Sequence, residues 1–167
     1  MNETQTPETL HFGWEEWISL PDLGVPALRA KVDTGARTSA LHAFDIETFG
    51  SQSRPKVRFT VHPIPGRDDL VIPCSAPILD RREVASSNGE KEMRFVIETT
   101  LAVNGQSWPI ELTLTNRSTM TSRMLLGRQA LKDHISIVAT DRFLQPELSY
   151  DVYHTSRMRE AQPRRAL

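Results

Sequence analysis

The chain has 167 residues, of which 38% are hydrophobic and 25% charged, with a formal net charge of −1. This length and composition are ordinary for one globular domain with its own hydrophobic core. The balanced charge gives no general attraction to nucleic acid or to anionic membranes, and no apolar run approaches the roughly 20 residues that span a bilayer. We therefore expect neither a nucleic-acid partner nor a membrane partner.

The ends of the chain and its cysteine content bear on compartment and domain limits. Residues 1–9 are polar and lack the basic start and apolar core of a secretory signal. The single cysteine, Cys74, has no second cysteine with which to form an intramolecular disulfide, which suits a reducing compartment. We expect a cytoplasmic protein with one domain over residues 10–150 and flexible tails at residues 1–9 and 157–167.

Three early segments have the character of β-strands. Residues 17–20 are predicted to form a strand that ends at Pro21-Asp22. Apolar residues alternate with polar ones at residues 57–61, and residues 70–72 suggest a further short strand. These segments are short and lie between stretches rich in turn-forming residues.

The strongest local pattern is a β-hairpin in the second half of the chain. Residues 95–103 alternate with a period of two, and residues 108–114 do so again. Asn104-Gly105 lies between them, and this pair is typical of a two-residue type I′ turn. The two segments are therefore predicted to pair as antiparallel strands.

Helix is expected to be scarce. Eleven prolines are spread along the chain, and proline interrupts helices. The one helix predicted is short, at about residues 128–132, and residues 135–139 return to β character. Many short strands joined by turns predict an all-β domain, either a closed barrel or a sandwich.

An acid, a hydroxyl and a glycine follow an apolar segment at Asp33, Thr34 and Gly35. Glycine permits backbone conformations and close approaches that other residues do not, and the Thr34 hydroxyl can hydrogen-bond locally and lock a loop. Aspartate and glycine are also common turn formers. By itself the tripeptide is therefore more often an ordinary turn at the end of a strand.

A second segment, Leu125-Leu126-Gly127-Arg128, has two apolar residues, a glycine and the start of a short helical turn. Together with the first motif it resembles the retroviral-type aspartic proteases, which have Asp-Thr-Gly-Ala early in the chain and this pattern near its end. The resemblance implies an acid-protease (retropepsin-like) closed β-barrel in which Asp33 is the catalytic carboxylate. It also implies that the segment 125–127 packs beneath the Asp33 loop and holds it.

Longer strings sharpen the resemblance to one bacterial family, which carries the label ATP-dependent zinc protease and is regarded as retropepsin-like. The matching stretches cover most of residues 12–131, and the most specific is Lys-Val-Asp-Thr-Gly-Ala-Arg-Thr-Ser-Ala-Leu-His-Ala at residues 31–43. Members are often found beside ligases that join glutamate residues to proteins. The resemblance therefore implies a hydrolase of peptides or proteins, with acidic, glutamate-rich chains as candidate substrates.

The chemistry of such an enzyme requires a second carboxylate. An aspartic protease activates water between two facing Asp side chains that share one proton. The chain holds a single Asp-Thr-Gly, because Asp22-Leu23-Gly24 lacks the hydroxyl. A two-fold homodimer would place Asp33 opposite Asp33 of a second copy, and the retropepsin-like resemblance implies the same arrangement.

A flap over the site is expected within residues 80–94, just before the long hairpin. Ser86, Ser87, Asn88 and Gly89 at its centre are typical of a turn. They form either a lid that grips the substrate backbone and keeps water out, or an ordinary surface hairpin tip.

One position departs from the retroviral pattern. Retroviral proteases carry an acid two residues after the motif glycine, which pairs with the arginine of the second motif, and this chain has Arg37 there. Arg37 and Arg128 would lie close together, which is unfavourable unless an anion sits between them. Either these arginines, with Ala36 beside them, receive an acidic side chain or a terminal carboxylate of the substrate, or they pair with acids elsewhere in the chain.

Neither a metal nor another cofactor is expected. The five histidines are scattered, His-Glu-x-x-His is missing, and no Gly-x-x-x-x-Gly-Lys-Ser/Thr loop is present to bind phosphates. Two alternatives to an aspartic peptidase stay open. One is a β-barrel binding module that has lost catalysis, and the other is a zinc-dependent metallopeptidase, as the family label says.

Overall fold

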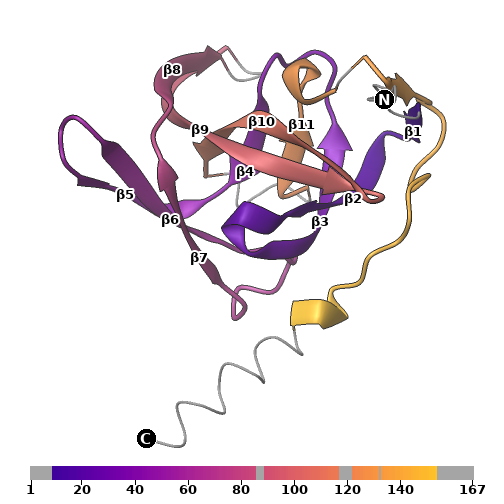
Figure 1. Ribbon diagram of the computed structural model, residues 1–167, viewed down its shortest axis with the longest axis horizontal. Coiled ribbons are helices and arrows are strands. Elements are labelled where there is room, and N and C mark those ends of the chain that lie inside the picture. Colours follow the sequence, from indigo (N-terminus) through magenta and orange to yellow (C-terminus); the bar gives the residue numbers. More distant parts are fainter. Residues whose placement is uncertain (1–8, 86–88, 117–121, 132, 154–167) are drawn as a thin grey trace, which may run out of the picture.

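The computed structural model describes residues 9–85, 89–116, 122–131 and 133–153, and strands dominate it (Figure 1). The strands are β1 (Leu10–Phe12), β2 (Glu15–Leu20), β3 (Val25–Val32), β4 (Ser39–His42), β5 (Phe44–Gly50), β6 (Pro55–Val61), β7 (Ile72–Pro77), β8 (Asp80–Ala85), β9 (Lys91–Val103), β10 (Gln106–Thr115), β11 (Met124–Leu126) and β12 (Ile135–Ile137). Two 3-10 turns accompany them, η1 (Pro21–Leu23) and η2 (Arg128–Ala130). The predicted all-β class is confirmed.

The main sheet has seven strands in the order β10-β4-β11-β3-β2-β9-β8. Strand β9 pairs with β10 along most of its length and with β2 at Ser19 opposite Ala102, so the strand order returns on itself. Strands β5, β6 and β7 form a separate antiparallel sheet whose β5–β6 end extends to one side of the molecule (Figure 1). Strands β1 and β12 form a parallel pair.

The predicted hairpin is present as β9 and β10, paired antiparallel from Val103 opposite Gln106. Its turn residues, Asn104 and Gly105, have φ angles of 50° and 74°. Positive φ at both central positions is what a type I′ turn requires, and asparagine and glycine tolerate it best. The local sequence therefore sets both the turn and the register of the two longest strands.

Other predicted elements differ from the structure in their limits. Strands β2, β6 and β12 lie where strands were predicted, but the strand predicted at residues 70–72 starts at Ile72. Leu70 is 9% exposed and joins the core from a loop, so its apolar character reflects packing rather than strand pairing. The helix predicted at residues 128–132 is the 3-10 turn η2, and Pro21-Asp22 begins a second 3-10 turn, η1.

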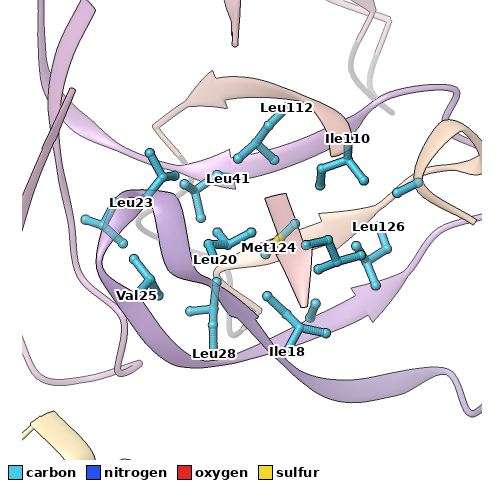
Figure 2. Packing of buried hydrophobic residues seen from close by; sticks show 14 of the residues in the cluster. Ile18, Leu20, Leu23, Val25, Leu28, Leu41, Ile110, Leu112, Met124 and Leu126 are labelled. Carbon is cyan, nitrogen blue, oxygen red and sulfur yellow. The ribbon is translucent and has the colours of Figure 1, made fainter. Parts of the chain in front are cut away.

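The core lies between strands of the main sheet (Figure 2), and buried residues of β6 and β7 also belong to it. Its fully buried side chains include Ile18, Leu20, Leu28, Leu41, Ile110, Leu112, Met124 and Leu126. Each such side chain contributes about 1.5–3 kcal/mol by leaving water. All three residues of β11 are buried, so packing fixes this short strand in the middle of the sheet.

The segment after β12 packs back onto β2 and β3. Glu16 is fully buried, and its carboxylate accepts hydrogen bonds from the backbone N–H groups of Gly13 (2.7 Å) and residues 144–145 (2.8 and 2.9 Å). The Tyr153 hydroxyl accepts a hydrogen bond from Ala27 N (3.1 Å) and donates one to the Ala27 carbonyl. These charge-assisted and neutral contacts hold the segment against the strands that lead to Asp33. No helix in the described part of the chain has the length and apolar character needed to cross a membrane.

Candidate active site

The Asp33 loop, residues 33–37, begins where β3 ends. Asp33 N donates a hydrogen bond to the Leu126 carbonyl oxygen (2.8 Å), and Asp33 Oδ1 accepts one from Gly35 N (3.1 Å). Asp33 is half-buried, whereas Thr34 and Gly35 are exposed. The backbone of β11 and the N–H of Gly35 thus orient the carboxylate at a surface that solvent reaches.

Strand β11 brings the second motif to this loop. It pairs parallel with β3, with Leu125 opposite Lys31 and Leu126 opposite Val32, and antiparallel with β4. Leu125 and Leu126 are both buried. Two segments far apart in the sequence therefore meet at one end of the sheet, with the Leu125–Gly127 backbone directly beside the Asp33 loop.

Position 127 requires glycine, because the backbone of residues 36–38 packs directly against it. A Cβ atom there would lie 2.7 Å from the Thr38 carbonyl carbon, 2.8 Å from the Thr38 oxygen and 3.0 Å from the Ala36 oxygen. Its N–H donates to Ser39 Oγ (3.1 Å). Gly35 is crowded to a lesser degree, because a Cβ would lie 3.3 Å from Asp33 Oδ1. Glycine at both positions allows the two segments to approach each other and the carboxylate.

Arg37 and Arg128 have neighbouring backbones. Arg128 N donates to the Ala36 carbonyl (2.8 Å), and Gln129 N donates to the Arg37 carbonyl (2.9 Å). The Arg128 guanidinium donates from Nη1 to the Thr34 carbonyl oxygen (2.8 Å). Both arginine side chains are exposed, and neither forms an ion pair with any residue that the structure describes. Both cations at this site are therefore reachable by an anionic ligand.

Glu111 is a site residue that the sequence did not reveal. It lies on β10 and accepts hydrogen bonds from Arg82 at Oε1 (3.0 Å) and Oε2 (3.2 Å). The hydrogen bonds from Arg82, followed by the charges of Arg82 and Arg37, hold the pKa of Glu111 below its ordinary value. Strand alternation places Glu111 on the polar face of the hairpin, but no spacing links it to β8 or to the Asp33 loop.

The hairpin expected to carry the flap is formed by β8 and β9, which pair from Asp80 opposite Val96 to Ala85 opposite Lys91. Three of the residues predicted at its tip, Ser86, Ser87 and Asn88, lie outside the described residues. The fourth, Gly89, has a φ angle of 86°. The lid function of this tip stays a prediction.

Two other ionisable groups are unsuited to catalysis. Burial, with smaller effects of nearby Arg123 and His62, lowers the pKa of His42 to about 4, and the His42 ring stacks in line with Phe44 and His62. Burial raises the pKa of the Cys74 thiol to about 12, so this thiol is a poor nucleophile. In the part of the chain that the structure describes, no group of three or more His, Cys, Asp and Glu side chains is placed to hold a metal ion.

Known proteins resemble this chain across the same region. The sequence model of the family described as RimB-like, retropepsin-like aspartic endopeptidase RimB, matches residues 11–148. Proteins named probable alpha-L-glutamate ligase from Shewanella pealeana and Desulfotalea psychrophila are 45% and 48% identical, over 78% and 75% of this chain but 29% and 27% of their own length. The chain thus spans less than a third of these curated relatives. A crystal structure of a Legionella pneumophila protein of unknown function matches with a TM-score of 0.65 and 27% identity, covering 80% of this chain and 96% of that one.

Proposed function

Because this chain belongs to the RimB-like family of retropepsin-like aspartic endopeptidases, we propose that it is a hydrolase that cleaves peptide bonds with the carboxylate of Asp33. The observation that carries the proposal is the junction of the two motifs, in which Asp33 N is hydrogen-bonded to the Leu126 carbonyl beside the close-packed Gly127. The strand order that returns on itself through β9 supports a closed barrel of the acid-protease kind.

The second carboxylate is proposed to come from a second copy of the chain. The exposure of Thr34 and Gly35 leaves the Asp33 loop open to such a copy. Trp14 lies beside it, since its carbonyl accepts a hydrogen bond from Val32 N (2.8 Å), and this side chain is 38% exposed. Exposed tryptophan is enriched at the centres of protein interfaces, which supports a two-fold homodimer around the loop.

The proposed reaction uses one proton shared by the two carboxylates. The ionised Asp33 removes a proton from water, and the water oxygen forms a bond to the carbonyl carbon of the peptide. The protonated Asp33 of the second copy donates a hydrogen bond to the carbonyl oxygen and polarises it. Transfer of a proton to the peptide nitrogen then allows the C–N bond to break, which releases an amine and a carboxylic acid.

The substrates are proposed to be acidic, glutamate-rich peptides. Arg37 and Arg128 present exposed guanidinium groups next to the Asp33 loop, and such groups bind carboxylates well. Relatives named probable alpha-L-glutamate ligase contain a region similar to this chain within a longer protein. A peptidase for glutamate-rich chains would hydrolyse bonds of the kind that a glutamate ligase forms.

The direct test is Asp33→Asn, which keeps the shape of the side chain and removes its ionisable group. Hydrolysis of glutamate-rich peptides should be abolished while circular dichroism and thermal unfolding stay those of the wild type, and chelators should not reduce wild-type activity. Asp22→Asn is a matched control, because Asp22 also lies in an Asp-x-Gly sequence but bonds to Thr100 instead (2.7 Å). Undiminished turnover by Asp33→Asn would rule out the mechanism. Inhibition by chelators would favour a metallopeptidase, and a wild-type chain that cleaves no peptide would favour a binding module.

The dimer is tested separately by sedimentation and activity on the same samples. The rate per chain should fall on dilution below the dimer dissociation constant. It should also rise and then fall with pH, because only the singly protonated pair of carboxylates contains both a base and an acid. A fully active monomer would contradict the dimer and leave the family assignment intact.

A further inference from the structure

A charged network lies on the β10 side of the Asp33 loop. Arg82 on β8 donates two hydrogen bonds to the Glu111 carboxylate and a third, from Nε, to Asp80 Oδ2 (2.9 Å). The backbone N–H of Glu111 donates to Gln129 Oε1 (2.9 Å), and Gln129 N donates to the Arg37 carbonyl (2.9 Å). The network therefore connects β8 and β10 to the loop that carries Arg37.

The carboxylate of Glu111 is fixed in place. Both of its oxygens are bound to the Arg82 guanidinium, and the two side chains are only 22% and 30% exposed. Paired, charge-assisted hydrogen bonds of this kind hold a carboxylate in one orientation. Glu111 therefore cannot swing toward Arg37 without breaking both bonds to Arg82.

Arg37 lies within the field of Glu111 but is not bound by it. The charge of Arg37 contributes to the lowered pKa of Glu111, yet no ion pair joins the two side chains. Among the residues that the structure describes, none binds the Arg37 guanidinium, while a fixed negative charge lies nearby. That negative charge repels a second carboxylate that approaches Arg37, and so it offsets part of the attraction that Arg37 exerts.

We propose that Glu111 is a specificity-determining residue, which limits how strongly the site selects acidic substrates by holding one negative charge near Arg37. The inference rests on the proposed function, in which Arg37 receives a substrate carboxylate. A substrate carboxylate must enter a field that Glu111 has already partly cancelled. Removal of the charge of Glu111 should therefore strengthen the binding of acidic peptides and leave neutral peptides unaffected.

The experiment compares Glu111→Gln with Glu98→Gln. Glu98 lies directly opposite Glu111 on β9, is exposed, and forms no ion pair within the described residues, so the same change in net charge is made one strand away. Dissociation constants for fluorescent glutamate and glutamine peptides of equal length are measured by anisotropy at low salt, in chains that also carry Asp33→Asn. Glu111→Gln should tighten glutamate-peptide binding about fivefold, as one nearby charge in a high effective dielectric would, and should not change glutamine-peptide binding.

Two further variants separate charge from structure. In an Arg37→Gln background the effect of Glu111→Gln should be much smaller, because Arg37 no longer holds the peptide carboxylate close to Glu111. Glu111→Asp alters the contact with Arg82 but keeps the charge, so it should lack the gain in glutamate-peptide binding; this separates loss of charge from loss of the contact. High salt should abolish the gain.

Weaker or unchanged glutamate-peptide binding in Glu111→Gln would overturn the proposal, and so would an equal gain in Glu98→Gln or in the Arg37→Gln background. If the chain that carries Asp33→Asn alone does not bind the glutamate peptide, the proposal is overturned as well. If Glu111→Gln tightens glutamate-peptide binding as expected but the wild-type chain cleaves no peptide, the proposed peptidase function alone fails. If the wild-type chain cleaves acidic peptides faster than neutral ones but Glu111→Gln does not tighten glutamate-peptide binding, only the proposed role of Glu111 fails.

Discussion

Replacing Gly127 by alanine would push a methyl group into the backbone that follows the Asp33 loop. The added Cβ would lie 2.7–3.0 Å from backbone atoms of Thr38 and Ala36, whereas an ordinary contact needs at least 3.4 Å. These atoms belong to the main chain and cannot turn away as a flexible side chain would. The strands must therefore separate by about half an ångström or more at this junction.

The size of the effect follows from the hydrogen bonds that cross the junction. They are Gly127 N to Ser39 Oγ (3.1 Å), Arg128 N to Ala36 O (2.8 Å) and Asp33 N to Leu126 O (2.8 Å). Breaking one of these bonds costs about 1 kcal/mol net, and overpacking adds about 1–3 kcal/mol, so we expect a loss of about 2–4 kcal/mol in the free energy of unfolding. Since misplacement of a catalytic group by about 1 Å can lower a rate about a hundredfold, we expect peptide hydrolysis to fall by about tenfold or more.

Urea unfolding and peptide hydrolysis measured on the same variant test both parts. Gly66→Ala is the matched control, because Gly66 has a φ angle of 81° and open space around its Cβ position. It should cost only about 1–2 kcal/mol for a left-handed alanine, with normal activity. A Gly127→Ala chain that unfolds within about 0.5 kcal/mol of the wild type and is fully active would refute the reasoning, since that is the size of an ordinary surface substitution.

Two predictions concern buried ionisable groups. Glu16→Ala leaves three backbone N–H groups without their acceptor, so it should lower the free energy of unfolding by about 3–5 kcal/mol in urea titrations. Glu147 lies in the same region but is exposed, so Glu147→Ala should change this free energy little. Equal effects of the two substitutions would contradict the prediction. The pKa of His42 is about 4 in the folded chain, below its ordinary value of 6.5. Between these two pH values the unfolded chain binds a proton at His42 that the folded chain does not, so the free energy of unfolding falls as the pH drops from 6.5 to 4. The loss should reach about 2 kcal/mol at pH 5 and be missing from His42→Gln, and parallel pH profiles of the two chains would refute it.

The elements predicted best from the sequence are those set by neighbouring residues, through alternation along a strand and through turn-forming pairs. The β9–β10 hairpin combines strict alternation with Asn104-Gly105, whose positive φ angles suit only a few residue types. Strand β8 was expected only as one side of the flap hairpin and not from a strand pattern of its own, because most of its residues are charged or exposed and it pairs only with β9 at the edge of the sheet. An edge strand with no buried face has little alternation to detect.

The site was predictable only in part for a similar reason. The Asp-Thr-Gly loop and Gly127 were found because they resemble two short motifs of the retropepsin-like proteases, and the structure places them side by side. The bond between Arg82 and Glu111 was not found, because it joins side chains of β8 and β10 across β9. Which charged residues face each other depends on sheet geometry, and neither composition nor spacing specifies it.

Strand β11 is only three residues long, yet it lies between β3 and β4 and supplies the carbonyl that holds Asp33. During synthesis β3 and β4 leave the ribosome long before residues 124–127 do. Pairings between such distant segments form slowly and late in folding. A nascent chain that has not yet reached Gly127 carries the Asp-Thr-Gly sequence without the backbone anchor that orients it, so the Asp33 loop would gain its geometry only after residues 124–127 have been made.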